Sequence, residues 1–272
     1  MTLLAVGQYL DLSLWQVALA AMLILANGLI SVALSLGLER RLLIASVRTI
    51  VQLAAIGYVL QWIFAVDRWY FVLLPVVVMT LIAGISAVRR TKTRYRGVWT
   101  HSIVAVTASS WIVTLFALTA IVRPERWYQA QYAIPLLGMI LGNTLTGVSL
   151  GLDRFGEELR SKRGQVEMLL TLGATRFEAA RGPIQESVRT GMIPIINSML
   201  VVGLVSLPGM MTGQLLAGAD PLGAVKYQIV IMFLIAAATA LGTVIAVLAG
   251  YRQLFNHRHQ FLYGRLKKAD VD

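Results

Sequence analysis

Seven long apolar segments run through this chain of 272 residues, and no other feature limits its fold as strongly. A helix needs about 20 mainly apolar residues to cross the hydrocarbon core of a bilayer. Charged residues make up only 14% of the chain, against about 25% in soluble domains, so most of its surface cannot face water. We therefore predict an all-α polytopic membrane protein with one transmembrane domain over residues 1–272. The predicted spans are residues 14–38, 42–64, 69–88, 102–122, 133–150, 192–217 and 227–250.

The basic residues alternate with these segments and set the predicted orientation. All but four of the 24 lysines and arginines fall on one side of the predicted membrane. Cytoplasmic loops are enriched in these residues, so we predict an N-terminus outside and a C-terminus inside. A nucleic-acid-binding protein would gather its charge on one soluble face, so the net charge of +11 does not indicate a nucleic-acid partner. The four exceptions are Arg68, Arg123, Arg126 and Lys226.

The interiors of the predicted spans lack the groups that ion-coupled transport and enzyme chemistry require. No Asp, Glu or Lys lies near the middle of a span, whereas a gradient-driven carrier usually keeps one there. The chain has no cysteine, and no carboxylate pair or nucleophile–base set in it supports an enzyme. None of its five lysines follows a glycine, so the phosphate-binding loop of an ATPase is missing. We predict that the chain is not itself an enzyme.

Two polar features in the spans have two interpretations each. Arg48 lies about one turn into the second span, and Gln52 follows on the same helix face. Either both side chains line a transport path, or the Arg48 side chain extends to the inner headgroups and has no role in transport. Asn143 brings an amide to mid-membrane depth in the fifth span, where it either bonds a neighbouring helix or lines a path.

Glycines recur at four-residue spacing in the fifth span, at Gly138 and Gly142 and again at Gly147 and Gly151. Small residues at this spacing let two helix backbones approach closely in a membrane. We therefore predict that these glycines lie at helix contacts.

The sixth span contains Pro208-Gly209, which we expect to break the helix because proline removes a backbone donor. Broken helices at membrane depth often mark substrate sites, so this segment is a candidate part of a transport path. Met210 and Met211 place thioethers beside the break and are candidate metal ligands, although methionine more often serves as adaptable packing. The candidate path residues are Arg48, Gln52, Asn143, Pro208, Gly209, Met210, Met211 and Thr212.

The one large hydrophilic segment is the predicted cytoplasmic loop, residues 152–191. Gly173 is suited to end a helix in the left-handed conformation, and Thr175 stands three residues before Glu178, the spacing of a capping box. The pattern predicts a short exposed helix from Thr175, interrupted at Gly182-Pro183, with Pro194 beginning the sixth span. Such a helix is a suitable docking point for a soluble partner.

The same loop carries a family resemblance. Glu167-Met-Leu-Leu-Thr-Leu-Gly-Ala-Thr-Arg, with Ile193-Pro194 after it, resembles the coupling segment of ABC-transporter permeases. Three longer strings, which begin at Val47, Pro135 and Ile193, resemble the FetB family. These are permease subunits of a bacterial iron-export ABC system and are similar to plant aluminium-tolerance permeases.

The resemblance implies a permease in the bacterial inner membrane that exports iron or another metal-related substrate. It implies a separate ATP-binding cassette subunit as partner, two copies of the permease, and no cofactor bound by this chain, because ATP would act through the partner. The implied coupling residues are Glu167, Gly173, Ala174, Thr175 and Glu178.

Two alternatives remain open. The first is a gradient-driven carrier or channel whose cytoplasmic loop is regulatory, which the lack of an ionisable residue within the spans disfavours. The second is a membrane scaffold or enzyme without transport activity, which no catalytic constellation supports.

Overall fold

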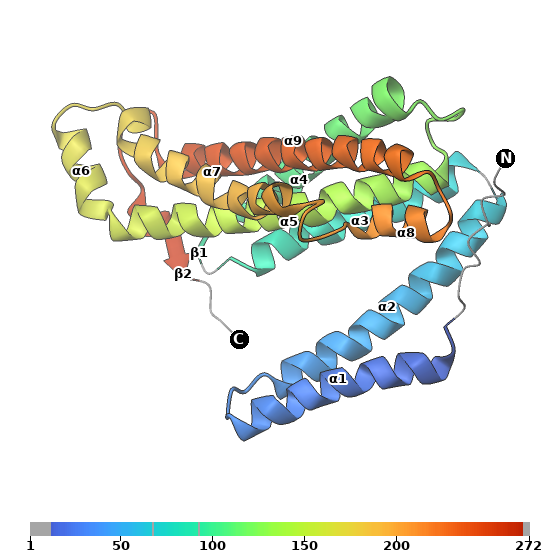
Figure 1. Cartoon of the computed structure of the whole chain (residues 1–272). Coiled ribbons are helices and arrows are strands. Elements are labelled where there is room, and N and C mark those ends of the chain that lie inside the picture. Colours follow the sequence, from blue (N-terminus) through green and yellow to red (C-terminus); the bar gives the residue numbers. More distant parts are fainter. Residues whose placement is uncertain (1–11, 67, 92, 269–272) are drawn as a thin grey trace.

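The computed structural model describes residues 12–66, 68–91 and 93–268, which form a helical protein with one small sheet. Figure 1 shows long helices packed into a bundle, with α5 in contact with α3, α4, α7 and α9. The elements are α1 (Leu14–Ala33), α2 (Glu39–Val66), α3 (Trp69–Arg89), β1 (Thr93–Tyr95), α4 (Val98–Phe116), the π-helix η1 (Ala117–Val122), α5 (Ala130–Ser161), α6 (Arg163–Thr171), α7 (Arg176–Val201), α8 (Gly209–Leu216), α9 (Pro221–Leu254), the 3-10 helix η2 (Tyr263–Arg265) and β2 (Leu266–Lys268).

The predicted fold class is confirmed. In the described part of the chain, six helices are long and apolar enough to cross a membrane: α1, α2, α3, α4 together with η1, α5 and α9. They coincide with six of the seven predicted spans, and α5 and α9 extend well beyond the predicted ends. The protein is an all-α polytopic membrane protein, while the number of crossings and the orientation stay predictions.

The remaining predicted span, residues 192–217, is not one helix. It begins inside α7, continues through an irregular segment at residues 202–208, and ends in the short helix α8. The predicted break is therefore present, but it lies before Pro208, which is the N-cap residue of α8. Proline suits this position because the first turn of a helix has no acceptor for its missing N–H.

Two other predictions about proline were wrong. Pro183 and Pro194 lie inside α7, which runs without interruption from Arg176 to Val201. A proline in a helix costs one backbone hydrogen bond, and that cost is offset where neighbouring helices hold the helix in place. α7 packs along both α5 and α9, and Pro183 itself is buried. Local sequence does not reveal this packing.

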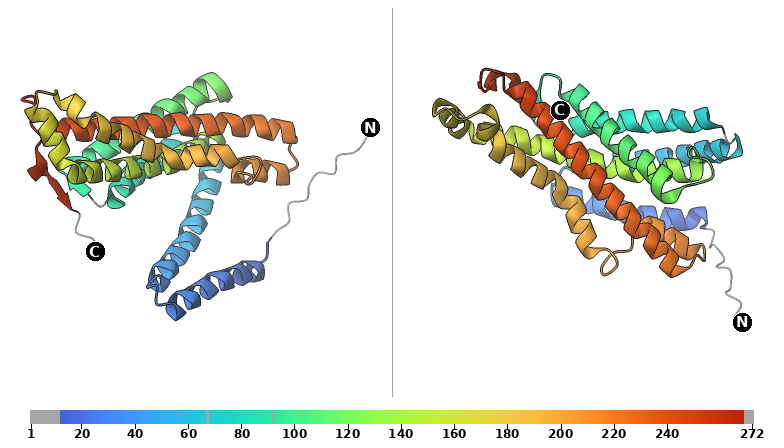
Figure 2. Two further views of the ribbon diagram at one scale, coloured as in Figure 1. Left: turned by 60° about the vertical axis from the view of Figure 1, so that its left-hand side comes forward. Right: turned by 90° about the horizontal axis from the view of Figure 1, so that it is seen from above.

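α1 and α2 form a hairpin that diverges from the bundle, as Figures 1 and 2 show. Its turn is held by Ser31, whose hydroxyl donates to the Glu39 carboxylate at 2.9 Å. α2 meets the bundle near its last turn, where Ile63 is buried and the Trp62 ring packs edge-on against Phe71. Almost the whole apolar length of this hairpin is therefore left to lipid or to another protein surface.

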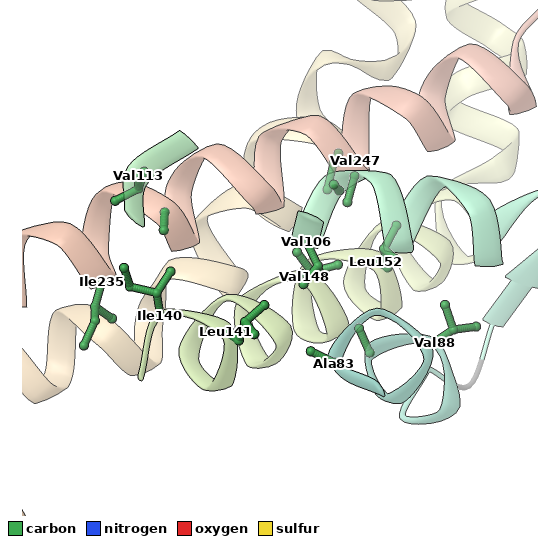
Figure 3. Close-up of a cluster of buried hydrophobic side chains, with 14 of the residues drawn as sticks. Ala83, Val88, Val106, Val113, Ile140, Leu141, Val148, Leu152, Ile235 and Val247 are labelled. Carbon is green, nitrogen blue, oxygen red and sulfur yellow. The ribbon is translucent and has the colours of Figure 1, made fainter. Parts of the chain in front are cut away.

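Branched aliphatic side chains from α3, α4, α5 and α9 fill the core of the bundle, as Figure 3 shows. Glycine allows the closest helix approach. A Cβ atom at Gly147 of α5 would lie 3.0 Å from the Gly191 carbonyl of α7 and would overlap the Thr239 methyl of α9. A Cβ atom at Gly151 would overlap the Thr243 methyl of α9, so the predicted packing role is confirmed for this pair. It is wrong for Gly142, where no atom of the described chain lies within 4 Å of such a Cβ.

A two-stranded antiparallel sheet, which we did not predict, joins β1 to β2. It ties the α3–α4 connection to the C-terminal segment, at the end of the bundle that also carries α6 (Figure 1). We call this the α6 end, and the opposite end, where α8 meets α9, the α8 end. The Tyr95 side chain is buried at the α6 end, and this burial raises the pKa of its phenol.

Candidate functional site

A cavity of about 300 Å³ lies between α5, α7, α8 and α9, directly beside the irregular segment 202–208. Along α9 the cavity wall extends from Gln228 to Ile235. At a rise of 1.5 Å per residue, this stretch lies about 10 to 21 Å along the helix from Pro221, the first residue of α9. This stretch falls within the predicted span 227–250, so we infer that the segment 202–208 beside it lies at membrane depth. Irregular backbone is tolerated there only where it is buried in protein or lines a water-filled space. This cavity is the candidate transport site.

The polar groups of the cavity are amides and hydroxyls. Asn143 donates from its side-chain nitrogen to the Met139 carbonyl at 2.9 Å, which leaves its amide oxygen available to a ligand. Ser198, in the last turn of α7, and Ser206, in the irregular segment that follows, contribute hydroxyls. The Gln228 side chain is 7% exposed, and its amide oxygen finds no hydrogen-bond partner among the described residues. A buried acceptor left unpaired costs free energy, so the oxygen of Gln228 is a strained point in the wall of the cavity.

Three methionines also line the cavity: Met139 of α5, Met210 of α8 and Met232 of α9. Met139 and Met210 also border a second, smaller hollow of about 30 Å³ that continues to Tyr132 and Tyr227 nearer the α8 end. No charged side chain lines either hollow in the described part of the chain. Nor do the described residues contain a cluster of three or more His, Asp or Glu side chains that could hold a metal ion.

The structure brings together half of the predicted path residues. Asn143, Pro208, Gly209 and Met210 all line the cavity. The other four do not: Met211 and Thr212 lie on α8 outside the lining, and Arg48 and Gln52 lie exposed on the diverging helix α2. The Thr212 hydroxyl instead donates to the Pro208 carbonyl within the first turn of α8.

Sequence reasoning missed Gln228, Met139 and Met232. A signal for them exists in the spacing, because Met139 precedes Asn143 by four residues and Gln228 precedes Met232 by four. Each of α5 and α9 thus presents one amide and one thioether on a single face. The pairs are inconspicuous in sequence because nothing local indicates that the two faces meet.

The predicted coupling segment lies at the α6 end and has the predicted local structure. Gly173 ends the turn after α6 with φ +93°, and Thr175 begins α7 as its N-cap. The Thr175 backbone N–H and hydroxyl both donate to the Glu178 carboxylate at 2.7 Å, and the Glu178 N–H returns a bond to the hydroxyl. These bonds lower the pKa of Glu178, and the bond from the Thr175 backbone N–H has the largest effect.

The C-terminal segment braces this start of α7. Nδ1 of His259 accepts a hydrogen bond from the Arg176 backbone N–H at 2.9 Å. The Phe177 ring packs edge-on against Tyr251 of α9, with ring centroids 5.9 Å apart. The start of α7 is thus held from outside its own sequence neighbourhood, by residues more than 70 positions away.

Ion pairs also lie at the α6 end, along α5 and α6 and between α5 and the middle of α7. Glu158 of α5 is buried and lies between Arg154 at 2.7 Å and Lys162 at 2.6 Å. Arg154 also reaches Glu186 of α7 at 3.8 Å. Glu167 pairs with Arg163 at 2.8 Å along α6, which raises the pKa of the arginine. Of the predicted coupling residues, Glu167 is therefore held by an ion pair within α6, and the Arg154 cluster joins α5 to the middle of α7.

Comparison with known proteins identifies the family. The sequence profile described as "Uncharacterised protein family (UPF0014)" matches residues 14–255. The chain belongs to UPF0014. The resemblance to the FetB family is thereby confirmed, since a UPF0014 relative from Escherichia coli (strain K12), "Probable iron export permease protein FetB", is 39% identical over 251 residues. The match covers 92% of this chain and 95% of the relative.

Two further relatives come from a cyanobacterium and a plant. A membrane protein of Synechocystis is 42% identical over 227 residues, covering 84% of this chain and 88% of the relative. "Protein ALUMINUM SENSITIVE 3" of Arabidopsis thaliana is 29% identical over 244 residues, covering 89% and 88%. No solved structure matches the chain. This UPF0014 protein is therefore a multi-pass membrane protein, and the printed names of two of its relatives refer to a metal, iron in one and aluminium in the other.

Proposed function

We propose that this UPF0014 protein is the permease subunit of an ABC transporter that exports a metal across the bacterial inner membrane. A separate ATP-binding cassette subunit supplies the energy, and this chain binds no cofactor. Iron is the first candidate cargo because of the printed name of the Escherichia coli relative.

One observation carries the proposal: α7 joins the capped, braced coupling segment to the cavity. Thr175 stands at one end of this helix, while Ser198 and Val202 line the cavity at the other. The 26 residues of α7 span about 39 Å, so a partner that moves the start of α7 also moves the cavity wall. A permease driven by a soluble ATPase requires such a mechanical connection.

A second copy of the chain is part of the proposal. Leu204 and Val205, at the tip of the irregular segment, are 89% and 82% exposed. Irregular backbone cannot face lipid directly, so another protein surface has to cover this tip or enclose a path beside it. Two copies of the permease, placed with these segments facing each other, would meet that requirement.

The gradient-driven carrier remains the second candidate. It needs a group that binds and releases the coupling ion, and the described cavity wall offers amides, hydroxyls and thioethers instead. The cavity therefore favours the ATP-driven alternative.

The coupling role can be tested by placing a charge in the coupling segment. Ala174→Glu should leave the helices inserted and should abolish stimulation of the partner's ATP hydrolysis by the permease, measured in proteoliposomes. Ala219→Glu makes the same change in the exposed turn between α8 and α9, far from the α6 end, and should leave stimulation unchanged. Full stimulation in the Ala174→Glu variant would contradict the docking of the ATPase at this segment.

A further inference from the structure

A groove of about 390 Å³ lies between α3, α4, η1 and α5, and it shares no lining residue with the candidate transport cavity. Four aromatic side chains line it: Trp69, Trp111, Trp127 and Tyr128. We call it the aromatic groove. In the described part of the chain, its other lining side chains are aliphatic except for the Thr114 hydroxyl, and none is charged. The groove therefore has room for a ligand of apolar chemistry.

One end of the aromatic groove lies where the sequence places the membrane interface. Trp69 is the first residue of α3, while Trp127 and Tyr128 belong to the connection that leads into α5. Trp and Tyr side chains gather at the boundary between hydrocarbon and headgroups. From Trp69 to Val76 the groove follows α3 for about 10 Å, less than the hydrocarbon depth of one leaflet, which is about 15 Å. The groove thus extends from the interface into the region of the acyl chains.

The groove has a buried floor and a rim that is exposed in the single chain. Val72 and Leu137 are buried, whereas Ile112 and Leu115 are 59% and 54% exposed. Leu118, also buried, belongs to the π-helix η1, a rare form of helix that is frequent at functional sites. Water does not stabilise an apolar groove, and an empty groove loses dispersion contacts along its walls. Because lipid surrounds a membrane-spanning helix, an acyl chain is the apolar group at hand to fill this space.

A polar hollow of about 310 Å³ borders the same connection. Its polar lining consists of Glu125, Arg126, Gln129 and Gln131. Arg126 of the hollow is followed directly by Trp127 of the groove, and consecutive Cα atoms are only about 3.8 Å apart, so the two spaces share this part of the chain as a wall. An arginine binds a phosphate and a carboxylate binds an ammonium group, so the hollow offers one partner to each charge of a zwitterionic headgroup.

We propose that one zwitterionic phospholipid occupies both spaces, with an acyl chain in the aromatic groove and its headgroup phosphate and ammonium beside Arg126 and Glu125. The groove alone fits any acyl chain, and the adjoining charged hollow at the interface selects a headgroup that carries both signs of charge. The site is separate from the candidate transport cavity, so it does not depend on the proposed function.

Native mass spectrometry of the full chain, purified in a mild detergent, can count the phospholipids that stay bound to each chain. The wild-type chain should retain one, and phosphatidylethanolamine should outcompete phosphatidylglycerol that has the same acyl chains. Leu73→Trp fills the groove from a half-buried position in its wall and should abolish retention. Leu74→Trp makes the same change at the next residue, which is 64% exposed and lies outside the groove, and should leave retention unchanged.

The headgroup contact gives a second variant, which keeps the proposal testable if Leu73→Trp does not fold. Arg126→Gln removes the charge beside the phosphate and should weaken binding of phosphatidylethanolamine roughly fivefold, the scale of one basic residue near a lipid headgroup. Arg123→Gln is the control, because the Arg123 side chain donates to the Ala120 carbonyl and lines neither space.

Three results would overturn the proposal: a wild-type chain without bound phospholipid, a preference for phosphatidylglycerol, or retention by Leu73→Trp or Arg126→Gln equal to that of the wild type. If the wild type carries no lipid and Leu73→Trp converts dimers into monomers in the same spectra, the groove is a contact with a second copy instead.

Discussion

Nδ1 of His259 accepts a hydrogen bond from the Arg176 backbone N–H, with 2.9 Å between the two nitrogens. The first N–H groups of a helix have no partner within the helix, so an external acceptor there acts as a cap. The C-terminal segment therefore helps to fix the position of the residues that we propose contact the ATPase.

Removal of this external cap should loosen the start of α7. His259→Ala leaves the Arg176 N–H without its acceptor and should cost about 1 kcal/mol of local stability, the usual scale of a lost cap. Hydrogen exchange at residues 175–179 should become correspondingly faster. His257→Ala removes an exposed imidazole from the same turn and serves as the control. Equal exchange in the two variants would show that the contact does not hold the helix.

The capping box should respond to acid. Hydrogen bonds from Thr175, the backbone N–H first and then the hydroxyl, lower the pKa of Glu178 below its ordinary value of 4.5. A carboxyl whose pKa is lower in the folded state stabilises the fold above its unfolded pKa, and this stabilisation is lost as the pH falls through the folded pKa. Protection of the first turn of α7 should therefore decrease below about pH 4.5.

Hydrogen exchange, corrected for its intrinsic pH dependence, can measure this effect. Glu178→Gln keeps an acceptor in the capping box but cannot titrate, so its protection should not change over that range. The same acid response in both proteins would assign the effect to another group.

The glycine contacts predict a sharp difference between two positions of α5. A Cβ at Gly147 would meet the Gly191 carbonyl and the Thr243 hydroxyl at 3.0 Å, whereas one at Gly142 would meet no described atom within 4 Å. Gly147→Ala should lower the stability of the detergent-solubilised protein by about 1–3 kcal/mol through overpacking. Gly142→Ala should be neutral or stabilising, because alanine is the better helix former. Thermal unfolding followed by size-exclusion chromatography would compare them; equal losses would contradict the packing of α5 against α7.

The buried carboxylate at the α6 end should matter more than its exposed neighbour. Glu158 lies between Arg154 and Lys162, so Glu158→Gln leaves two partly buried cations without their shared partner. We expect a loss of about 1–2 kcal/mol, because both cations keep some access to solvent. Glu157→Gln, on an exposed side chain of the same helix, should cost less than about 0.5 kcal/mol. Chemical unfolding of both variants would test the difference.

The features that were predictable from sequence are those that local chemistry determines. The Thr175–Glu178 capping box and the left-handed Gly173 follow from side chains a few residues apart, and both are present. The apolar lengths predicted seven spans, and six of them coincide with long helices of the structure. Pro183 and Pro194 were misread because packing against α5 and α9, which holds α7 straight through them, is a long-range property.

The candidate site was only half predictable for the same reason. Asn143, Pro208, Gly209 and Met210 stand out locally as polar or helix-breaking residues within apolar segments. Gln228 stands near the start of an apolar helix, and its place in the cavity lining appears only when α9 is packed beside α5 and α7. The β1–β2 pairing and the cap from His259 join distant segments, which periodicity cannot predict.

The most direct test of the ATP-driven export mechanism uses inverted membrane vesicles that carry this chain with its candidate ATP-binding subunit. Metal accumulation, followed with iron, should require ATP and should vanish when the ATP-binding subunit is omitted. Accumulation without ATP or without that subunit, and sensitive to collapse of the ion gradients, would contradict the mechanism and favour the gradient-driven carrier.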